Sequence, residues 1–298
     1  MGFWIKSTKL KLLPQSDSMT QKLADLHIHT RYSDSTSSPE EVVQQARACG
    51  LSCIAITDHD TIDGINPTME AAKHCDLEVL SGIELSTEIQ GKDIHILGYC
   101  FNHNDGPFIE HLKIIQNSRL ERMKKMIEKL KLVGIKNIEL EEVCALAKSS
   151  SLGRPHLAAM LVEKGIVTDR QTAFNKYLAD GGIAYVPKYK QTPQEAIQWI
   201  QNLGGVTVLA HPALTQIDSL ISGLVDLGLK GLEVYYANTS NQIIHFYEGL
   251  AKKYNLLMTG GSDAHGKAKR NTFIGKTKIP YELVEKLKER VDESRRRR

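Results

Sequence analysis

Short apolar runs alternate along the chain with stretches in which apolar residues recur every three or four positions. Runs of the first kind are typical of buried strands, and the second spacing is typical of helices that pack on one face. The apolar runs predict seven strands, near residues 24–29, 53–58, 78–84, 93–99, 206–210, 231–236 and 256–261. The amphipathic stretches predict helices near residues 39–49, 66–75, 216–227, 239–254 and 281–292. This alternation favours an α/β fold built on a parallel sheet or barrel.

Two of the predicted helix starts have the same signature. Segment 38–41 (SPEE) combines a serine N-cap, a proline in the first turn and a glutamate three residues after the cap, which together form a capping box. Segment 192–195 (TPQE) repeats this arrangement. Gly50 and Gly204 lie where the two helices should end, at positions that favour a left-handed residue. An apolar run follows each helix, so the same helix–strand unit is expected in both halves of the chain.

The region 104–190 interrupts this alternation and has a helical pattern throughout. Gly134 is a fitting end for its first helix, and segment 168–171 predicts a further capping box. Apolar residues of that first helix recur at positions 108, 112, 115, 123, 126, 127, 130 and 133. We therefore expect a barrel made of residues 23–103 and 191–293, an inserted all-helical subdomain that caps the substrate over 104–190, a flexible extension over 1–22 and a basic tail over 294–298.

Composition and charge narrow the classes of function. The chain has 298 residues, of which 41% are hydrophobic and 24% charged, as in ordinary globular proteins. Lysine and arginine exceed aspartate and glutamate by 38 − 35 = 3, and without the four arginines at 295–298 the difference is 34 − 35 = −1. The folded body is therefore close to neutral, which argues against a general nucleic-acid coat and requires any phosphate binding to be local.

The cysteines and the chain start indicate a compartment. The five cysteines have loose spacings without the paired pattern of a structural zinc site, so we expect free thiols in a reducing compartment. The first twenty residues lack an apolar core of signal-peptide length, and no stretch of the chain approaches a membrane span. We therefore expect a cytoplasmic protein that does not associate with membranes and needs no obligate protein partner.

Candidate chemistry gathers at the predicted strand ends. Six of the eleven histidines fall there, together with three carboxylates. The nine residues are His27, His29, Asp34, His59, Glu84, His95, His211, Asp263 and His265. One histidine in a strand is commonly a hydrogen-bonded core residue, but the strand ends of a parallel barrel meet at one mouth. So many buried polar groups would be costly without cations, and they are too many for one ion, so we expect two or three divalent metals.

With these residues in place, the sequence resembles the polymerase and histidinol phosphatase (PHP) family. The resemblance rests on His-x-His followed by Asp34, on "TDHD" at 57–60, Glu84 in "GIE", His95, "AHP" at 210–212 and "SDAH" at 262–265. It implies a distorted seven-stranded (β/α) barrel with a trinuclear metal site, in which manganese is the expected ion and iron or zinc the alternatives. The implied sets are His27, His29, Glu84 and Asp263 for one metal, Glu84, His95 and His211 for the second, and Asp34, His59 and His265 for the third.

The helical region narrows the resemblance further. Segments 151–167 and 177–200 look like the small bacterial PHP phosphoesterases that act on nucleotides. Members of that group remove the 3′-phosphate of 3′,5′-bisphosphonucleotides such as pAp, and related members trim short RNA from its 5′ end. The resemblance makes Arg154 and His156 candidate catalytic and substrate-phosphate residues, with Lys188 as a third contact. The alternatives are a salt bridge for Arg154, a core-facing cap neighbour for His156 and a solvated loop charge for Lys188.

The hypothesis from the sequence is a metal-dependent phosphoester hydrolase for a nucleotide or short oligonucleotide. In it, a metal-bridging hydroxide attacks phosphorus, Arg154 neutralises the phosphoryl oxygens and His156 can protonate the leaving oxygen. Asp58 and Asp60 are expected to orient an imidazole or to form the turn. The alternatives within enzymes are histidinol phosphate as substrate and a proofreading exonuclease, and outside them a non-catalytic nucleotide-binding regulatory protein.

Overall fold

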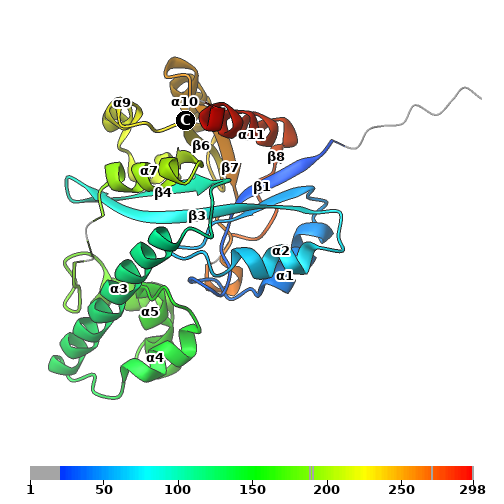
Figure 1. Ribbon diagram of the computed structural model, residues 1–298. Helices are drawn as coiled ribbons and strands as arrows, with labels where there is room; N and C mark the ends of the chain where they lie inside the picture. Colours follow the sequence, from blue (N-terminus) through cyan, green and yellow to red (C-terminus); the bar gives the residue numbers. More distant parts are fainter. Residues whose placement is uncertain (1–20, 188, 190, 270, 297–298) are drawn as a thin grey trace, which may run out of the picture.

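A computed structural model describes residues 21–296 apart from 188, 190 and 270. Its centre is one eight-stranded sheet with the order β7-β6-β5-β4-β3-β2-β1-β8, curved into a nearly closed barrel (Figure 1). The strands are β1 (Leu23–Ile28), β2 (Cys53–Ile56), β3 (Glu78–Ile89), β4 (Lys92–Tyr99), β5 (Val206–Leu209), β6 (Gly231–Tyr236), β7 (Leu257–Gly261) and β8 (Ile279–Pro280). The predicted α/β barrel is confirmed.

The strand count and the strand directions correct the prediction. An eighth strand, β8, pairs antiparallel with the start of β1 and is only two residues long, too short to produce a hydrophobic period. Strand β4 runs antiparallel to both β3 and β5, whereas β1 with β2 and β5 with β6 pair in parallel. The sheet is therefore mixed rather than parallel throughout, because the tight turn at Gln90 and Gly91 joins β3 directly to β4.

Strands β1 and β7 approach one another closely at the mouth of the barrel. The His29 amide donates to the Ala264 carbonyl oxygen over 3.1 Å, and Ile28 and Ala264 form a parallel bridge. A Cβ atom on Gly261 would lie 2.4 Å from the backbone nitrogen of His27, so only glycine allows this approach. Closure at this end brings residues near both termini to one site.

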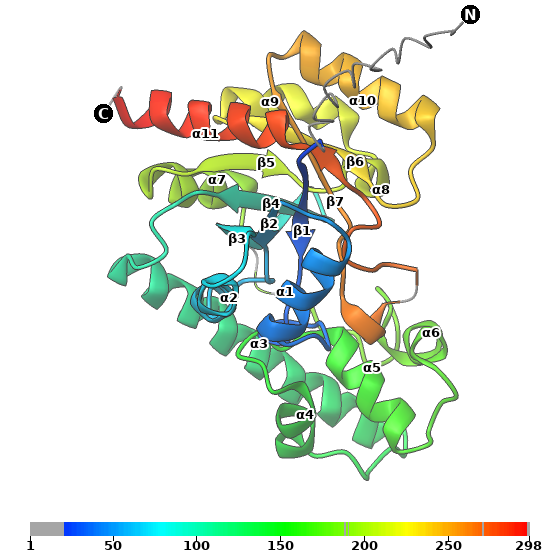
Figure 2. The same ribbon diagram turned by 90° about the vertical axis from the view of Figure 1, so that its right-hand side faces the viewer.

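Helices cover the outside of the sheet (Figure 2). They are α1 (Pro39–Ala48), α2 (Ile65–Ala72), α7 (Pro193–Asn202), α8 (Pro212–Thr215), α9 (Ile221–Asp226), α10 (Asn241–Lys253) and α11 (Tyr281–Arg296). Of the three predicted capping boxes, those at Ser38 and Thr192 are present. The helix predicted over 216–227 starts late: Gln216, with a positive φ of 50°, ends α8, and a 3-10 turn, Asp218–Leu220, then leads into α9. The last helix reaches Arg296, four residues beyond its predicted end, so part of the expected basic tail is helical.

The helical region lies below the barrel mouth in Figure 2, on the side toward which β1 points. It comprises α3 (Gly106–Leu132), α4 (Leu140–Ala147), α5 (Arg154–Glu163), α6 (Arg170–Ala173) and a π-helical turn, Phe174–Leu178. These elements share an apolar core that is separate from the clusters around the sheet. The predicted cap at 168–171 is wrong by one residue, because the Asp169 carboxylate accepts from the Thr172 amide and caps α6. No helix in the part of the chain that the structure describes is long and apolar enough to cross a membrane.

All five cysteines are free thiols. Cys53 is buried in β2, and burial raises the pKa of its thiol. None of the potential metal-ligand groups found among the described residues includes a cysteine. The thiols therefore contribute apolar packing rather than a metal site.

Candidate metal centre

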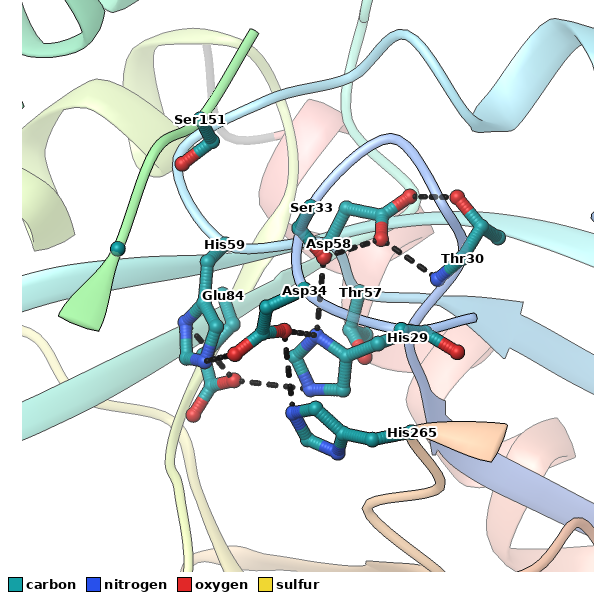
Figure 3. A network of polar contacts seen from close by, with 12 residues as sticks. His29, Thr30, Ser33, Asp34, Thr57, Asp58, His59, Glu84, Ser151 and His265 are labelled. Carbon is teal, nitrogen blue, oxygen red and sulfur yellow. Dashed lines mark hydrogen bonds and ion pairs between the residues drawn. The ribbon is translucent and has the colours of Figure 1, made fainter. Parts of the chain in front are cut away.

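The nine histidines and carboxylates predicted as ligands converge at the barrel mouth, and Figure 3 shows part of this cluster. Most lie near or just after the end of a strand, as expected: His27 near the end of β1, His29 directly after β1, His59 after β2, and His211 after β5. Asp34 lies in the loop after β1, and Asp263 and His265 lie after β7. Strands far apart in sequence thus contribute side chains to one polar cluster.

Two of the nine correct the expectation that every ligand lies at the C-terminal end of a strand. Glu84 is in the middle of β3, which continues to Ile89. His95 lies in the first half of β4, opposite Ser86. Because β4 runs in the reverse direction, its first half is the part that lies at the mouth.

The Glu84 carboxylate is the hub of the cluster. It is buried, and its two oxygens face five imidazoles. The distances are 3.2 Å to His27 Nε2, 3.2 Å to His29 Nε2, 3.3 Å to His59 Nδ1, 2.7 Å to His95 Nδ1 and 3.0 Å to His211 Nε2. Burial alone would raise the pKa of Glu84, but the surrounding imidazoles outweigh it and hold this pKa well below its usual range.

The hydrogen bonds of His27 and His29 show that this arrangement fits a cation. His27 Nδ1 lies 2.8 Å from Glu233 Oε1, so in the neutral ring Nδ1 carries the proton and Nε2 a lone pair. The Ser33 hydroxyl donates to Asp58 over 2.6 Å, so its oxygen can accept from His29 Nδ1 at 3.4 Å. In the neutral rings both Nε2 lone pairs then face the same Glu84 oxygen at 3.2 Å, and a positive charge between them, a metal ion or a proton, makes that approach favourable.

The same logic holds for His265 and Asp34. His265 Nδ1 donates to the backbone carbonyl oxygen of Asp263 over 2.8 Å, which leaves its Nε2 lone pair 3.1 Å from Asp34 Oδ1. That Asp34 oxygen has no hydrogen bond of good geometry although it is buried, and neither has His59 Nδ1. Buried polar atoms without hydrogen bonds are rare, and divalent cations would satisfy these.

The carboxylates of this site also affect the pKa of His29. Burial lowers the pKa of its imidazole, but the contacts with Asp263 and Glu84 outweigh burial and raise this pKa to about 10. The carboxylates thus stabilise a positive charge at the position where the ligand atoms converge.

Three groups of side chains have ligand atoms close enough to share an ion. They are His27, His29, Glu84 and Asp263; His29, Asp34, His59 and His265; and His59, Glu84 and His95. Two of them contain the first and third sets implied by the resemblance. The third group pairs Glu84 and His95 with His59, whereas the resemblance pairs them with His211. His211 Nε2 lies 3.0 Å from Glu84 Oε1, the same oxygen that His95 Nδ1 contacts.

Residues behind the cluster fix its ligand atoms, and sequence reasoning missed three of them: Glu233, Tyr236 and Lys269. Glu233 Oε1 accepts from His27, and its Oε2 accepts from the His211 amide over 2.7 Å. The second oxygen of Asp263 accepts from Tyr236 over 2.8 Å and from Lys269 over 2.5 Å. The signal for Glu233 was one acidic residue in the apolar strand segment "GLEVYY". A strand pattern does not show that Glu233 lies behind the candidate metal ligands.

Asp58 and Asp60 stabilise loops, and within the described residues their carboxylates do not bond to the side chains of the candidate metal ligands. The Asp58 carboxylate accepts from the Thr30 amide, the Thr30 hydroxyl and the Ser33 hydroxyl, and so fixes the loop that leads to Asp34 (Figure 3). Asp60 is left-handed, with φ of 50°, and forms an ion pair with Arg119 of α3. The helical region is thereby tied to the loop that carries the histidine next to Asp60.

A cavity of about 250 Å³ adjoins the metal ligands and is rich in arginine. Its walls include Arg119, Arg122 and Arg154 as well as His59 and His95. Burial, together with the other two guanidinium groups, lowers the pKa of Arg122 to about 10, so Arg122 remains charged at neutral pH. This arginine compartment can bind an anion next to the metal centre.

Two of these arginines pair with carboxylates, and the third does not within the described residues. Arg119 pairs with Asp60, and Arg154 contacts Asp180 over 2.5 Å. Within the described residues, Arg122 bonds the neutral Val186 carbonyl oxygen over 2.7 Å and contacts no carboxylate. Sequence reasoning missed Arg119 and Arg122. They lie in a long amphipathic helix, and the charged side chains of such a helix usually face solvent.

The outcome differs among the three residues predicted to contact the substrate. Arg154 lines the arginine compartment, as expected. His156 is buried, its Nδ1 accepts from the Gly153 amide and its Nε2 lies 3.0 Å from the Ser33 carbonyl oxygen. Both ring nitrogens are therefore occupied by backbone groups. Lys188 lies outside the described residues.

Comparisons with known proteins agree with this geometry. The PHP domain model matches residues 25–291. A 3′,5′-nucleoside bisphosphate phosphatase of Chromobacterium violaceum is 31% identical over 258 residues, which cover 85% of this chain and 90% of that protein. A 5′-3′ exoribonuclease of Haemophilus influenzae is 33% identical over 255 residues, which cover 83% and 91%. The solved structure of a candidate metal-dependent phosphoesterase from Bifidobacterium adolescentis has a TM-score of 0.82 and 30% identity, and the match covers 90% of this chain and 96% of that one.

Proposed function

The chain belongs to the PHP domain family and is a metal-dependent phosphoesterase, and we propose that it hydrolyses the 3′-phosphate of 3′,5′-bisphosphonucleotides such as pAp. The observation that carries this proposal is the arginine compartment beside the metal ligands. One phosphate of the substrate would lie at the metals and the other among the arginines. A substrate with two phosphate groups uses both places at once.

The nine residues at the barrel mouth would hold two or three divalent cations, with manganese favoured by the mixed nitrogen and oxygen ligands and iron or zinc as alternatives. Bound there, such cations supply Lewis acidity and lower the pKa of a coordinated water toward about 7. Glu233 keeps the His27 lone pair pointed into the site, and Tyr236 and Lys269 hold the outer oxygen of Asp263.

The arginine compartment would bind the 5′-phosphate of the substrate. The terminal phosphate is a dianion near neutral pH, and guanidinium groups bind phosphate oxygens in pairs. Arg122 can bind a phosphate without first losing a carboxylate partner. At Arg154, a phosphate must compete with the Asp180 carboxylate. We therefore assign the main phosphate contact to Arg122 and an auxiliary contact to Arg154.

The role of His156 changes in this proposal. Because its Nδ1 accepts from Gly153, its Nε2 carries the proton and donates to the Ser33 carbonyl oxygen. Burial also lowers the pKa of this imidazole, which favours the neutral form. His156 would thus position the start of α5, with its arginine, against the loop that carries Asp34, rather than protonate the leaving oxygen.

The proposal is tested with a substrate panel under defined metals. Purified protein with Mn²⁺ should release phosphate from pAp, and a chelator should abolish this release. Adenosine 3′-monophosphate should be a much poorer substrate because it lacks the phosphate for the arginine compartment. Histidinol phosphate hydrolysed in preference to pAp would overturn the nucleotide assignment.

A further inference from the structure

A second and larger cavity also adjoins the candidate metal ligands. It has a volume of about 800 Å³, against about 250 Å³ for the arginine compartment. Asp34, Pro155 and Phe174 line both cavities, and His265 lines the larger one, so the two meet at the barrel mouth. Pockets for small organic ligands measure roughly 300–1,000 Å³, so the larger cavity has room for a bulkier group than a phosphate.

The larger cavity combines apolar and polar walls. Its apolar part comprises Pro155 and Val162 of α5, Phe174 of the π-helical turn, and Ala268 in the loop after β7. Arg170 of α6 donates to the Ala268 carbonyl oxygen over 2.8 Å and so joins the helical region to that loop. The remaining side chains that line the cavity are polar or charged. Sites for small organic ligands have this mixed composition.

Phe174 is the aromatic residue at the junction of the two cavities. It is half-buried, begins the π-helical turn and lines both cavities. The Arg154 guanidinium lies over its ring, 5.9 Å from the ring centre, in a cation–π contact. Neither cavity has another phenylalanine, tyrosine or tryptophan among the described residues that line it. Phe174 therefore offers a flat π-surface next to the metal centre.

The covalent structure of a 3′,5′-bisphosphonucleotide requires a third place at the site. The two phosphates are attached through C3′ and C5′ of the ribose, and the base is attached to C1′ across the sugar ring. With the 3′-phosphate at the metals and the 5′-phosphate among the arginines, the base fits neither of these places. The larger cavity adjoins the same metal ligands and shares Phe174 with the arginine compartment, so it lies within reach of C1′.

We propose that the larger cavity is a nucleobase site in which the base of the substrate stacks on Phe174. This rests on the proposed function. Every base has a π-face, so stacking accepts any base and favours the larger purine rings. A sugar bisphosphate without a base lacks this contact. Phe174 thereby selects nucleotides among the molecules that carry two phosphates.

The test compares pAp with its base-free analogue, 1-deoxyribose 3,5-bisphosphate, which keeps both phosphates. In the wild type, kcat/KM for pAp should exceed that for the analogue by about 5- to 150-fold, the range expected for one stacked base. Phe174→Leu keeps an apolar side chain but removes the ring, and it should lower this ratio by about fivefold or more. Phe174→Trp restores an aromatic surface and should keep the ratio at the wild-type value or above it.

The ratio separates base stacking from the contact between Phe174 and Arg154. Both substrates carry the 5′-phosphate, so a disturbed arginine changes both by the same factor and leaves the ratio unchanged. A second readout needs no hydrolysis. The fluorescence of 2-aminopurine riboside 5′-monophosphate is quenched when its base stacks, and we expect quenching with saturating wild-type protein and with Phe174→Trp but not with Phe174→Leu.

The matched control is Phe246→Leu, which changes an exposed phenylalanine of α10 that lines neither cavity. It should leave kcat/KM for both substrates unchanged. A wild-type ratio near one would overturn the nucleobase site. A Phe174→Leu variant that loses the same factor with both substrates would overturn it as well, because the ring would then act only through Arg154. A wild-type protein that hydrolyses neither substrate would instead refute the proposed function.

Discussion

Strand β3 carries two glutamates whose surroundings differ in one decisive way. Glu78, at the start of the strand, contacts the Lys288 ammonium over 2.5 Å and the Tyr281 hydroxyl over 2.6 Å. Glu84, six residues later, contacts only imidazoles. Within the described residues, the chain supplies a fixed cation to Glu78 and none to Glu84, while Lys269 pairs with Asp263 at the mouth.

This difference separates a structural carboxylate from a functional one. A buried or half-buried carboxylate is unremarkable when a lysine and a hydroxyl satisfy its oxygens. A fully buried carboxylate among histidine lone pairs is costly unless a cation arrives from outside. A cation bound at the mouth would be exchangeable and able to take part in chemistry, whereas Lys288 is part of the chain.

The largest effect should come from Glu84→Gln. The substitution removes the negative charge that faces five histidines, so we expect phosphate release from pAp to fall by about a thousandfold or more, equivalent to at least about 4 kcal/mol of lost transition-state stabilisation. Steady-state kinetics with Mn²⁺ measures this, and circular dichroism checks that the variant is folded. Activity within tenfold of the wild type would show that the Glu84 charge is not required for catalysis.

Arg122→Gln should have the next largest effect. Loss of a charge-assisted contact with the 5′-phosphate should lower kcat/KM for pAp about 10- to 150-fold, mainly through KM. The control substrate is adenosine 3′-monophosphate, which has no phosphate for this arginine and should respond much less. If both substrates lost the same factor, Arg122 would act on the fold or on the metals instead.

Glu233→Gln sharpens the distinction between ligands and the residues behind them. Both oxygens of Glu233 accept hydrogen bonds, and an amide can accept only with one side, so one donor would be left unmatched. We expect metal affinity to fall about 10- to 100-fold. A Mn²⁺ titration of activity should show a higher midpoint and nearly full recovery at saturation. An unshifted midpoint would argue against an orienting role.

His156→Asn separates positioning from proton transfer. A general acid contributes about 10²- to 10⁴-fold, whereas a residue that only joins two backbone segments should cost less than about tenfold here. The pH profile of kcat should keep its shape in the variant. Loss of the limb on the alkaline side would restore His156 as the proton donor.

The smallest effect is expected for Glu78→Gln, which tests the other end of β3. Its ion pair with Lys288 is partly exposed, so we expect a loss of about 0–1 kcal/mol in the free energy of unfolding. Hydrolysis of pAp should be unchanged. A strong loss of activity would show that the two ends of the strand are coupled and would break the comparison.

The sequence was sufficient for the barrel and for the candidate ligands, for physical reasons that apply locally. His27 and His29 share a face because strands have a period of two, and they do lie 3.2 Å apart. Capping boxes are read from four adjacent residues, and those at Ser38 and Thr192 are present. The metal ligation itself stays a prediction until metal binding is measured.

What the sequence could not give depends on tertiary neighbours. The reversed direction of β4 places His95 at the mouth from the first half of its strand, which no strand-end rule anticipates. Arg122 enters the site only because α3 lies across the mouth, and in its helix it looks like a solvent-facing charge. Glu233 is one acidic residue in a buried strand, and its partners come from β1 and the end of β5.

The most direct test of the central claim is the metal content of three proteins purified in Mn²⁺ and freed of loose ions. Elemental analysis should find two or three ions per chain in the wild type and the same number in Glu78→Gln. Glu84→Gln should lose at least one ion, because Glu84 belongs to two of the three ligand groups. A wild-type protein without bound metal, or a Glu84→Gln variant with undiminished metal content, would contradict the account.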